Sequence, residues 1–476
     1  MFVFVMSIVM ARASWASPDT VFVVNSKDAG PGSFRSAILM ANSDPTIRRV
    51  LFLGQVSTIF LTQTVEFAGT QDLSIAGGGA TLDGSKAGGG AAFVASGGGN
   101  LSVSSLKVRN APSEGIAVLV PAWATGTIRV SLVNLDIVNN LGHGVLVNDQ
   151  EDSSTTDGVQ PDPDGSAASV DVSVLNSRFI HNGYSVSDRD GLRVNEGGAG
   201  DLILTVKHTL AQENGADGIE IDERGAGDVR LDMFATRLVG NGPFDPLDLD
   251  DGFDIDEYND GSILGTVVLS QASHNFEEGF DFNENNAGDL RVHMQLVEAT
   301  GNGEEGIDLE EDDDFGEDGD PNGGGGDLVA VMSNIVTIGN GNGADGALKI
   351  REKETGSLDV TLTNILSVNN FGSGIFARES QTGSSVVKIT RALVSSNRIS
   401  DLGDDGFAGG HGIELLESGG GDLTATVSST NSAGNEGFGV FGDETGAGAG
   451  TVTLSGVTFF GAPNGTGNTG GSAIVP

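Results

Sequence analysis

Acidic side chains recur at a fixed spacing in the middle of this chain. In four successive segments, the residues two and four positions after a glycine are Glu220 and Asp222, Asp254 and Asp256, Asp281 and Asn283, and Asp308 and Glu310. A glutamate follows each pair, at Glu223, Glu257, Glu284 and Glu311. Carboxylate oxygens are the hard ligands that Ca²⁺ prefers, because it takes about six to eight of them in a flexible geometry. We therefore predict bound Ca²⁺, with these candidate ligands: Asp254, Asp256, Asp281, Asp308, Glu257, Glu284, Glu310 and Glu311.

The overall charge narrows the choice of partners. The chain has 66 acidic and 24 basic residues, a net charge of -42. Phosphate groups require cationic partners, so we expect no binding to nucleic acid or to an anionic membrane surface. The same charge allows a second interpretation of the acidic segments, a solvated face that binds no metal. The chain has no cysteine, which excludes disulfides and thiolate metal sites.

Basic residues follow the acidic segments. In GALKIREKE, from Gly346 to Glu354, the pattern is shifted by one residue, so we expect Lys349 and Arg351 to face the same side as the carboxylates, as does Arg378 in the next segment. A calcium-dependent polysaccharide lyase has this layout: Ca²⁺ binds a uronate carboxylate and Lys or Arg removes the α-proton. Lys349, Arg351 and Arg378 are thus candidate catalytic residues. The alternative is that they form ion pairs at the end of the acidic block.

Two Gly-His-Gly tripeptides, at His143 and His411, and the paired Asp404 and Asp405 resemble the polygalacturonase glycoside hydrolases. Those enzymes also have an N-T-D string upstream and a basic string downstream. This chain has no N-T-D string and no Lys or Arg after Arg398. A hydrolase is therefore less expected than a lyase.

The acidic positions belong to an internal repeat. Gly191 to Gly218, Gly252 to Gly279, Gly279 to Gly306 and Gly412 to Gly439 are each intervals of 27 residues. Each unit has an Asn four residues before the glycine, an alternating strand, a Gly-rich turn with a second strand, and a third, shorter apolar stretch. Three strands and three turns in this length predict a parallel β-helix of about ten coils. The recurrent Asn predicts a hydrogen-bonded Asn ladder from coil to coil.

The segment from Asp28 to Asn42, DAGPGSFRSAILMAN, differs from the repeats. Its apolar residues Phe34, Ala37, Ile38 and Ala41 fall on one face of a helix that Ser33 can cap, and such a helix would cover the open first coil. The string resembles the opening G-P-G-S-L-R-x-A-I-x-x-A-N of bacterial surface and secreted proteins with pectin-lyase-like repeats, with Phe34 in place of Leu. This resemblance implies a right-handed parallel β-helix over residues 20 to 460. It does not imply one chemistry, because those proteins include lyases, hydrolases and adhesins.

The start of the chain predicts export. An apolar run from Phe2 to Met10 leads to small residues, which is typical of a signal peptide over residues 1–16, although no Lys or Arg precedes the run. The run is too short to span a bilayer, so we expect no membrane insertion. We divide the rest into an N-terminal cap and first coils (17–100), β-helix repeats (101–460) and a tail (461–476). The expected location is secreted or at the cell surface.

Insertions occur at both ends of the acidic strand. Long turns lie before the glycine at 184–189, 243–250 and 399–410, and after the acidic turn at 150–169 and 311–326. Such loops would form the walls of a groove that accepts an extended polysaccharide. Two functions follow: an exported, calcium-stabilised β-helix that binds polysaccharide or cell-surface glycan or acts structurally or adhesively, or a calcium-dependent polysaccharide lyase that acts by β-elimination. The sequence leaves open whether the protein is an enzyme.

Overall fold

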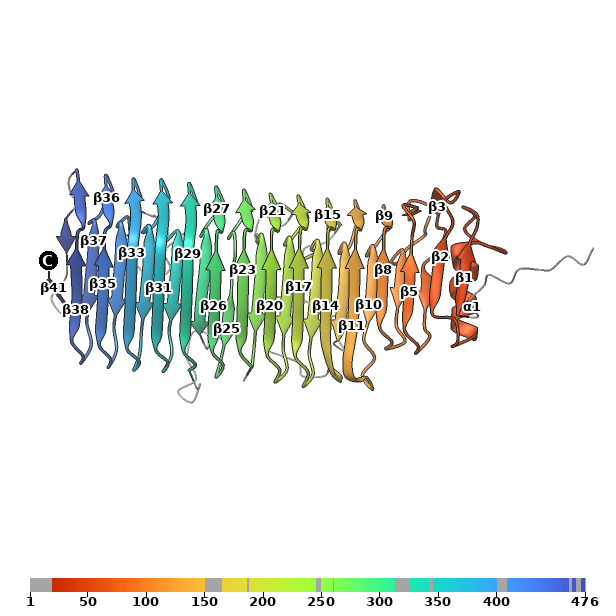
Figure 1. The fold of residues 1–476 in the computed structure, drawn as a ribbon, viewed down its shortest axis with the longest axis horizontal. Coiled ribbons are helices and arrows are strands. Elements are labelled where there is room, and N and C mark those ends of the chain that lie inside the picture. Colours follow the sequence, from red (N-terminus) through yellow and green to blue (C-terminus); the bar gives the residue numbers. More distant parts are fainter. Residues whose placement is uncertain are drawn as a thin grey trace, which may run out of the picture.

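The structure is a computed structural model that describes residues 19–149, 165–185, 188–244, 250–259, 261–312, 325–341, 346–399, 409–461, 465–467 and 472–475. Parallel strands stack along one axis into a rod, with the only helix of the described residues at one end and the C-terminus at the other (Figure 1). The predicted parallel β-helix is confirmed. The strands belong to two continuous parallel sheets, which we call sheet 1 and sheet 2.

Sheet 1 has one strand from each coil and contains the acidic segments. Its fourteen strands are β4 (Val65–Phe67), β7 (Phe93–Ala95), β10 (Ile116–Leu119), β13 (Val145–Asp149), β16 (Leu192–Glu196), β19 (Ile219–Glu223), β22 (Phe253–Glu257), β25 (Asn283–Asn285), β28 (Ile307–Asp312), β30 (Leu348–Glu352), β32 (Ile375–Glu379), β34 (Ile413–Glu417), β37 (Val440–Glu444) and β40 (Thr466–Gly467). This exceeds the predicted ten coils, because β4, β7 and β40 lack the preceding Asn and Gly signature.

Sheet 2 contains the other two strands of each coil. Its strands are β1 (Thr20–Val23), β2 (Arg49–Phe52), β3 (Thr58–Phe60), β5 (Leu73–Ala76), β6 (Thr81–Asp83), β8 (Leu101–Ser104), β9 (Lys107–Arg109), β11 (Thr125–Val133), β12 (Asp136–Val138), β14 (Ala167–Leu175), β15 (Arg178–Ile180), β17 (Leu202–Lys207), β18 (Leu210–Gln212), β20 (Val229–Phe234), β21 (Arg237–Val239), β23 (Ile263–Val268), β24 (Gln271–Ser273), β26 (Leu290–Gln295), β27 (Glu298–Thr300), β29 (Leu328–Ile338), β31 (Leu358–Val368), β33 (Ser385–Ser395), β35 (Leu423–Ser428), β36 (Asn431–Ala433), β38 (Gly450–Ser455), β39 (Thr458–Phe460) and β41 (Ser472–Val475). In most coils a residue with positive φ turns the chain between the two strands of sheet 2; His208, with φ of 53°, does so between β17 and β18.

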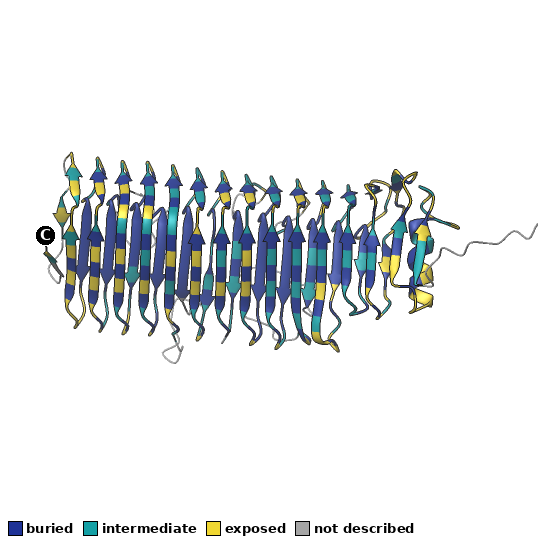
Figure 2. Ribbon diagram, in the orientation of Figure 1, coloured by how far each residue is buried: buried dark blue, intermediate teal, exposed yellow. Residues whose placement is uncertain are grey.

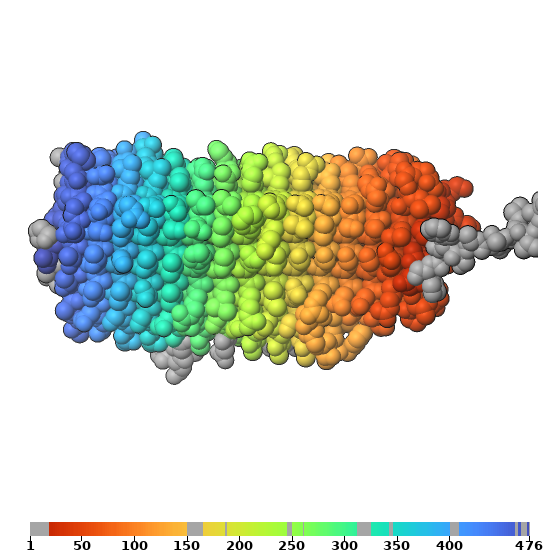
Figure 3. All heavy atoms as spheres, viewed as in Figure 1, coloured from red at the N-terminus to blue at the C-terminus, as the bar shows by residue number. Residues whose placement is uncertain are grey.

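The core follows from the period-2 alternation of each strand. In β20, for example, Val229, Leu231 and Met233 are buried while Arg230 and Asp232 are exposed. Parallel pairing in register stacks like positions of successive coils, so buried and exposed residues form rows along the rod (Figure 2). The atoms of successive coils follow one another as bands along the rod (Figure 3). An outward position of one strand therefore becomes a column of side chains on the surface.

The predicted Asn ladder is confirmed. Ten buried asparagines stack in successive coils: Asn140, Asn182, Asn214, Asn241, Asn275, Asn302, Asn340, Asn370, Asn397 and Asn435. Each Nδ2 donates to the Oδ1 of the next Asn at 2.9–3.2 Å. Because the amide is both donor and acceptor, one side chain type satisfies itself along the whole column.

The predicted capping helix is also confirmed. Helix α1 (Phe34–Ser43) begins after Ser33, whose hydroxyl accepts a hydrogen bond from the N–H of Ser36 at 3.2 Å. The buried residues of α1 are the four predicted from its periodicity: Phe34, Ala37, Ile38 and Ala41. The ring of Phe34 lies 5.2 Å from that of Phe52 and 5.9 Å from that of Phe93, so the helix packs on the first coils.

Several sequence predictions fall partly or wholly outside the described residues. These are the signal peptide over residues 1–16, the paired Asp404 and Asp405, much of the tail, and large parts of the insertions expected to form a groove. Over the described ranges, no helix has the length and apolar character needed to cross a membrane.

Candidate functional site

The acidic segments form columns on the outer face of sheet 1. One column consists of Arg193, Glu220, Asp254, Asp281, Asp308 and Lys349, in coil order. Each is the second residue of its strand except Asp281, which lies two residues before β25 at the equivalent position. A second column lies just before the strands and contains Asp190, Asp217, Asp251, Glu278 and Glu305. In this second column, the backbone N–H of Asp217 donates to Asp190, and that of Glu278 donates to Asp251. Turn and strand thereby place two carboxylate columns side by side.

Carboxyl groups of the two columns meet in triads. Ligand oxygens lie within 4.8 Å of one another in the groups Asp188, Asp190 and Glu220; Asp217, Glu220 and Asp254; Asp251, Asp254 and Asp281; Asp251, Glu277 and Glu278; and Glu278, Glu304 and Glu305. Neighbouring triads share Glu220, Asp254, Asp251 or Glu278. The second and third triads, which we call the central triads, line a hollow of about 220 Å³. The hollow is bounded by nine carboxyl groups, the Tyr258 phenol and Asn283.

The carboxyl groups of the hollow are poorly solvated. The Oδ1 atoms of Asp254 and Asp281 are buried and accept no hydrogen bond from the protein. Burial raises the pKa of Asp254 well above its ordinary value, and the charges of Asp256 and Asp281 raise it further. Burial also raises the pKa of Asp281 well above its ordinary value, and the charges of Asp308 and Glu310 raise it further. A multivalent cation among these oxygens would remove both costs.

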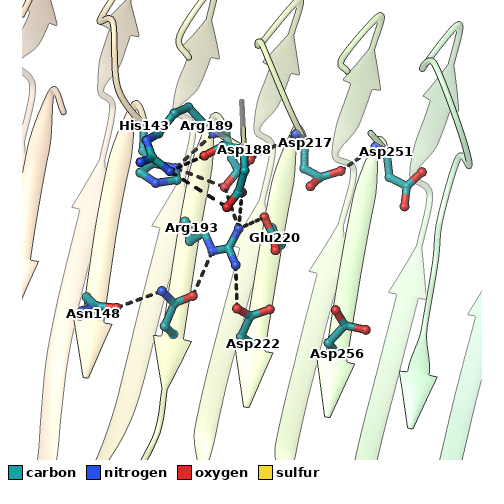
Figure 4. A network of polar contacts seen from close by, with 12 residues as sticks. His143, Asn148, Asp188, Arg189, Arg193, Asp217, Glu220, Asp222, Asp251 and Asp256 are labelled. Atoms are coloured by element: carbon teal, nitrogen blue, oxygen red, sulfur yellow. Dashed lines mark hydrogen bonds and ion pairs between the residues drawn. The ribbon is translucent and has the colours of Figure 1, made fainter. Parts of the chain in front are cut away.

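A guanidinium group occupies the first triad. Arg193 is fully buried, and its Nη1 lies 2.6 Å from Oδ1 of Asp188 and 3.7 Å from Oδ2 of Asp190, and also contacts Glu220 (Figure 4). Its Nη2 lies 2.6 Å from Asp222. Burial alone would lower the pKa of Arg193, but Asp222 and Glu220 raise it well above the usual value. This end of the acidic columns is therefore closed by a permanent cation.

An ammonium group closes the other end. Nζ of Lys349 lies 2.7 Å from Asp308, 2.5 Å from Glu310 and 3.8 Å from Glu305. Burial would lower the pKa of Lys349, but Asp308 and Glu310 hold it well above its usual value. The predicted one-residue shift is present, because Ile307 pairs with Leu348 and so Lys349 stacks on Asp308.

Other basic residues reinforce this end. Nη2 of Arg351 lies 2.6 Å from Glu310, and Nζ of Lys353 lies 3.0 Å from the same carboxyl group. Arg378 pairs in register with Arg351 on the next strand. Of the three candidate catalytic residues, Lys349 and Arg351 thus neutralise carboxylates, which was the alternative interpretation of their position.

The predicted metal ligands separate into three sets. Asp254, Asp256 and Asp281 line the hollow. Asp308 and Glu310 hold Lys349 instead. Glu257, Glu284 and Glu311 are fully buried at the strand ends, where they accept backbone N–H groups of the next turn.

The predicted ligand set left out two parts of this site. Asp217 and Asp251 complete the triads; the sequence shows them as acidic residues that precede repeat glycines, but they were not among the candidate ligands. Arg193 was also missed, although it stands at the outward position of the coil before Glu220.

The two Gly-His-Gly histidines occupy repeat positions. Nδ1 of His143 accepts the N–H of Asp190 at 3.0 Å. In the next coil, Asp190 accepts the N–H of Asp217 in the same way, so His143 occupies a position of this column. His411 accepts the N–H of Phe438 at 2.8 Å and stacks on Phe441 with 4.8 Å between ring centroids. Burial lowers the pKa of His411 to about 4.

No family model and no curated protein matches this sequence. Among solved structures, the chain is similar to PfbA, a surface adhesin of Streptococcus pneumoniae (11% identity, 94% of this chain and 92% of that chain, TM-score 0.37). It is also similar to the A-module of the Azotobacter vinelandii mannuronan C-5 epimerase AlgE4 (12%, 95% and 100%, 0.34) and to pectate lyase Pel9A (13%, 96% and 82%, 0.28). The particular feature of this parallel β-helix is the acidic face of sheet 1.

Proposed function

We propose that this protein is an exported, calcium-stabilised β-helix that binds a glycan at the cell surface in a structural or adhesive role. The supporting observation is the series of carboxylate triads along sheet 1. The first triad encloses the guanidinium of Arg193, and the ammonium of Lys349 lies among Glu305, Asp308 and Glu310 at the far end. The fold itself therefore uses these positions to hold positive charge.

The central triads need the same compensation from outside the chain. Within the described ranges, no Lys or Arg forms an ion pair with Asp251, Asp254 or Asp281. Two carboxylates one coil apart, about 4.8 Å, repel by about 3 kcal/mol at an effective dielectric constant of about 20. Ca²⁺ fits better than Mg²⁺, because shared carboxylates in an open hollow suit a large ion with variable coordination. We assign Asp217, Glu220, Asp251, Asp254 and Asp281 as its ligands.

Exposed aromatic residues in the turns before sheet 1 support glycan binding. Tyr184, Phe244 and Phe276 precede the acidic column residues in their coils, and these residues are 37%, 36% and 42% exposed. The rings of Tyr184 and Phe244 pack edge to face at 5.9 Å. Exposed aromatic rings offer apolar faces to sugar rings, while Ca²⁺ with open coordination positions can accept sugar hydroxyl or carboxylate oxygens.

The lyase alternative receives no comparable support. A general base must be able to accept a proton, and the raised pKa of Lys349 keeps it as ammonium. The pairing of Lys349 and Arg351 with Asp308 and Glu310 further favours a charge-neutralising role. We therefore treat β-elimination as an outcome for the experiment to detect.

The first test is calorimetric titration of Ca²⁺ into chelator-treated protein, together with thermal unfolding in Ca²⁺ and in chelator. Asp254 belongs to two triads, so Asp254→Asn should weaken Ca²⁺ binding at least tenfold and remove most of the calcium-dependent increase in Tm. Asp359→Asn is the matched control, because it removes one carboxylate from an exposed position on sheet 2. Equal Ca²⁺ affinity in the wild type and Asp254→Asn would contradict the proposed site.

The second test is retention on immobilised alginate, pectate and neutral glucans, with Ca²⁺ or with chelator. The proposal expects calcium-dependent retention that Asp254→Asn reduces and Asp359→Asn leaves unchanged. The ultraviolet absorbance of the same incubations reports unsaturated uronate products. Product formation that Lys349→Ala abolishes would overturn the structural role in favour of the lyase.

A further inference from the structure

A third column of acidic residues faces the inside of the coil and is separate from the outer triads. The last residue facing the core in nine successive strands of sheet 1 is a glutamate: Glu196, Glu223, Glu257, Glu284, Glu311, Glu352, Glu379, Glu417 and Glu444. Each pairs in register with the next along the rod. All are between 0% and 4% exposed. We call this set the glutamate ladder.

Each carboxyl group of the ladder is hydrogen-bonded on one side only. Oε1 of Glu352 accepts the backbone N–H groups of Glu354 at 2.8 Å and Gly356 at 3.2 Å. Oε1 of Glu379 accepts those of Gln381 at 3.0 Å and Gly383 at 2.9 Å. One oxygen in every member of the ladder makes a turn contact of this kind. The other oxygen is buried and receives no hydrogen bond from the protein.

The groups that face the ladder are themselves acidic. Its strongest electrostatic neighbours are the ladder glutamates one coil away, with Asp149 at the N-terminal end and Glu354 and Asp422 beside the turns. Arg224 and Lys353 follow ladder residues in sequence, but their charged groups pair with Asp222 and Glu310 on the outer face. A column of ionised carboxylates would therefore be both desolvated and self-repelling.

We propose that the glutamate ladder is a chain of carboxylic acids, in which each neutral group donates its proton to the unpaired carboxyl oxygen of the next coil. The proposal rests on Glu352, Glu379, Glu417 and Glu444. These residues lie beyond Lys349, in coils that have no part in the acidic hollow, and the other five glutamates share their geometry. A carboxylic acid, like the amide of the Asn ladder, is both donor and acceptor, so it can satisfy itself along a column.

The pKa directions agree with this geometry. Burial raises the pKa of Glu352 to about 9, with a further contribution from Glu311, and that of Glu379 to about 7. Burial also raises the pKa of Glu417 and Glu444. The unfolded chain ionises near its ordinary value of about 4.3, so between that pH and the folded pKa the native state binds more protons than the unfolded state. The stability that the ladder contributes is therefore complete below the unfolded pKa and is lost as pH rises through about 7 to about 9.

The hydrogen bonds of the ladder therefore make the contact between successive coils of the β-helix sensitive to pH. At acidic to neutral pH the protonated ladder ties each coil to the next, and at alkaline pH its ionisation loosens the coils beyond Lys349. This effect is opposite in sign to that of salt-bridged carboxylates, whose stability is lost on acidification.

The ladder can be tested without changing its shape, because glutamine is the non-titrating equivalent of glutamic acid. We would measure the unfolding free energy of the wild type, Glu379→Gln/Glu417→Gln and the exposed control Glu436→Gln from about pH 5 to about pH 10, with chelator present. The slope of stability against pH counts the protons released on unfolding. The double variant should release fewer protons than the wild type where the slope is steepest, and the control should release the same number as the wild type.

Infrared spectroscopy of the wild type gives a readout that does not depend on whether a variant folds. The ladder predicts a band for the carbonyl stretch of buried carboxylic acids at neutral pH, which should disappear on alkaline titration. Absence of that band, or equal pH slopes in the wild type and the double variant, would overturn the proposal. A second series with Ca²⁺ in place of chelator completes the test. If Ca²⁺ stabilised the wild type but not the double variant, the column would hold a metal cation and the proposal would be overturned.

Discussion

Arg193 determines where the acidic columns end. It is fully buried and contacts Asp188, Glu220 and Asp222, so it compensates carboxyl groups that are themselves removed from water. Removing one partner of a buried ionic cluster typically costs about 3–5 kcal/mol, because the remaining charges stay buried and unpaired.

We predict that Arg193→Met lowers stability by about that amount in chelator but much less in Ca²⁺. The loss of the guanidinium frees the triad of Asp188, Asp190 and Glu220, which Ca²⁺ can then occupy. Thermal unfolding of wild type and variant in chelator and in Ca²⁺ checks this, with Arg230→Met on the exposed face of β20 as the control. An equal loss of stability in both conditions would mean that this triad does not accept a metal.

At the scale of single residues, the sequence predicted which acidic residues face outward from the strand, but not that the glutamate after them faces the core. Positions two and four after the repeat glycine face outward, as predicted for Asp254 and Asp256. Position five is odd, so the same alternation directs Glu257 into the core. Sequence reasoning placed Glu257 in the turn and treated it as a metal ligand. The backbone N–H of Asn259 that it accepts is not visible in a sequence pattern.

At the scale of elements, the Asn ladder determines how strongly each coil is tied to the next. Oδ1 of Asn275 accepts both the backbone N–H and the Nδ2 of Asn241, at 3.1 Å and 3.0 Å, and its Nδ2 donates to Asn302 at 3.0 Å. All three residues are buried, so loss of this side chain leaves unsatisfied groups on both sides.

We predict that Asn275→Ala destabilises the protein by about 2–3 kcal/mol, because a buried polar group without a partner costs about 1–3 kcal/mol. Asn431→Ala, at an exposed position on β36, should change stability by less than about 0.5 kcal/mol. Denaturant unfolding measures both. If the two substitutions had equal effects, the ladder would contribute no more than an exposed polar residue.

The elements themselves could largely be predicted from the sequence. Helix α1 was identified from Ser33 and the spacing of Phe34, Ala37, Ile38 and Ala41, because capping and periodicity are local properties. The strands β4 and β7 of the first coils were not located individually from the sequence, because they pack against the cap and lack the Asn and Gly signature. The walls of the predicted groove depend on insertions without a repeat, and periodicity gives no information on those.

At the scale of the whole molecule, the acidic charge is arranged in columns along a rod and is not spread over a sphere. Screening in physiological salt extends over about 8 Å, which exceeds the coil spacing of about 4.8 Å. Monovalent salt therefore weakens repulsion between distant parts of the rod but leaves most of the repulsion between adjacent carboxylates within a column.

We predict that chelated protein gains only modest stability from added NaCl, whereas Ca²⁺ at much lower concentration raises Tm further, and Mg²⁺ has an intermediate effect. Ca²⁺ binds several carboxylates at once, so its stabilisation grows with the logarithm of its concentration above Kd, whereas screening only reduces an existing repulsion. Thermal unfolding in each salt, matched for ionic strength, separates the two effects. Equal stabilisation by NaCl and CaCl₂ at the same ionic strength would mean that the outer face is a solvated acidic surface that binds no metal.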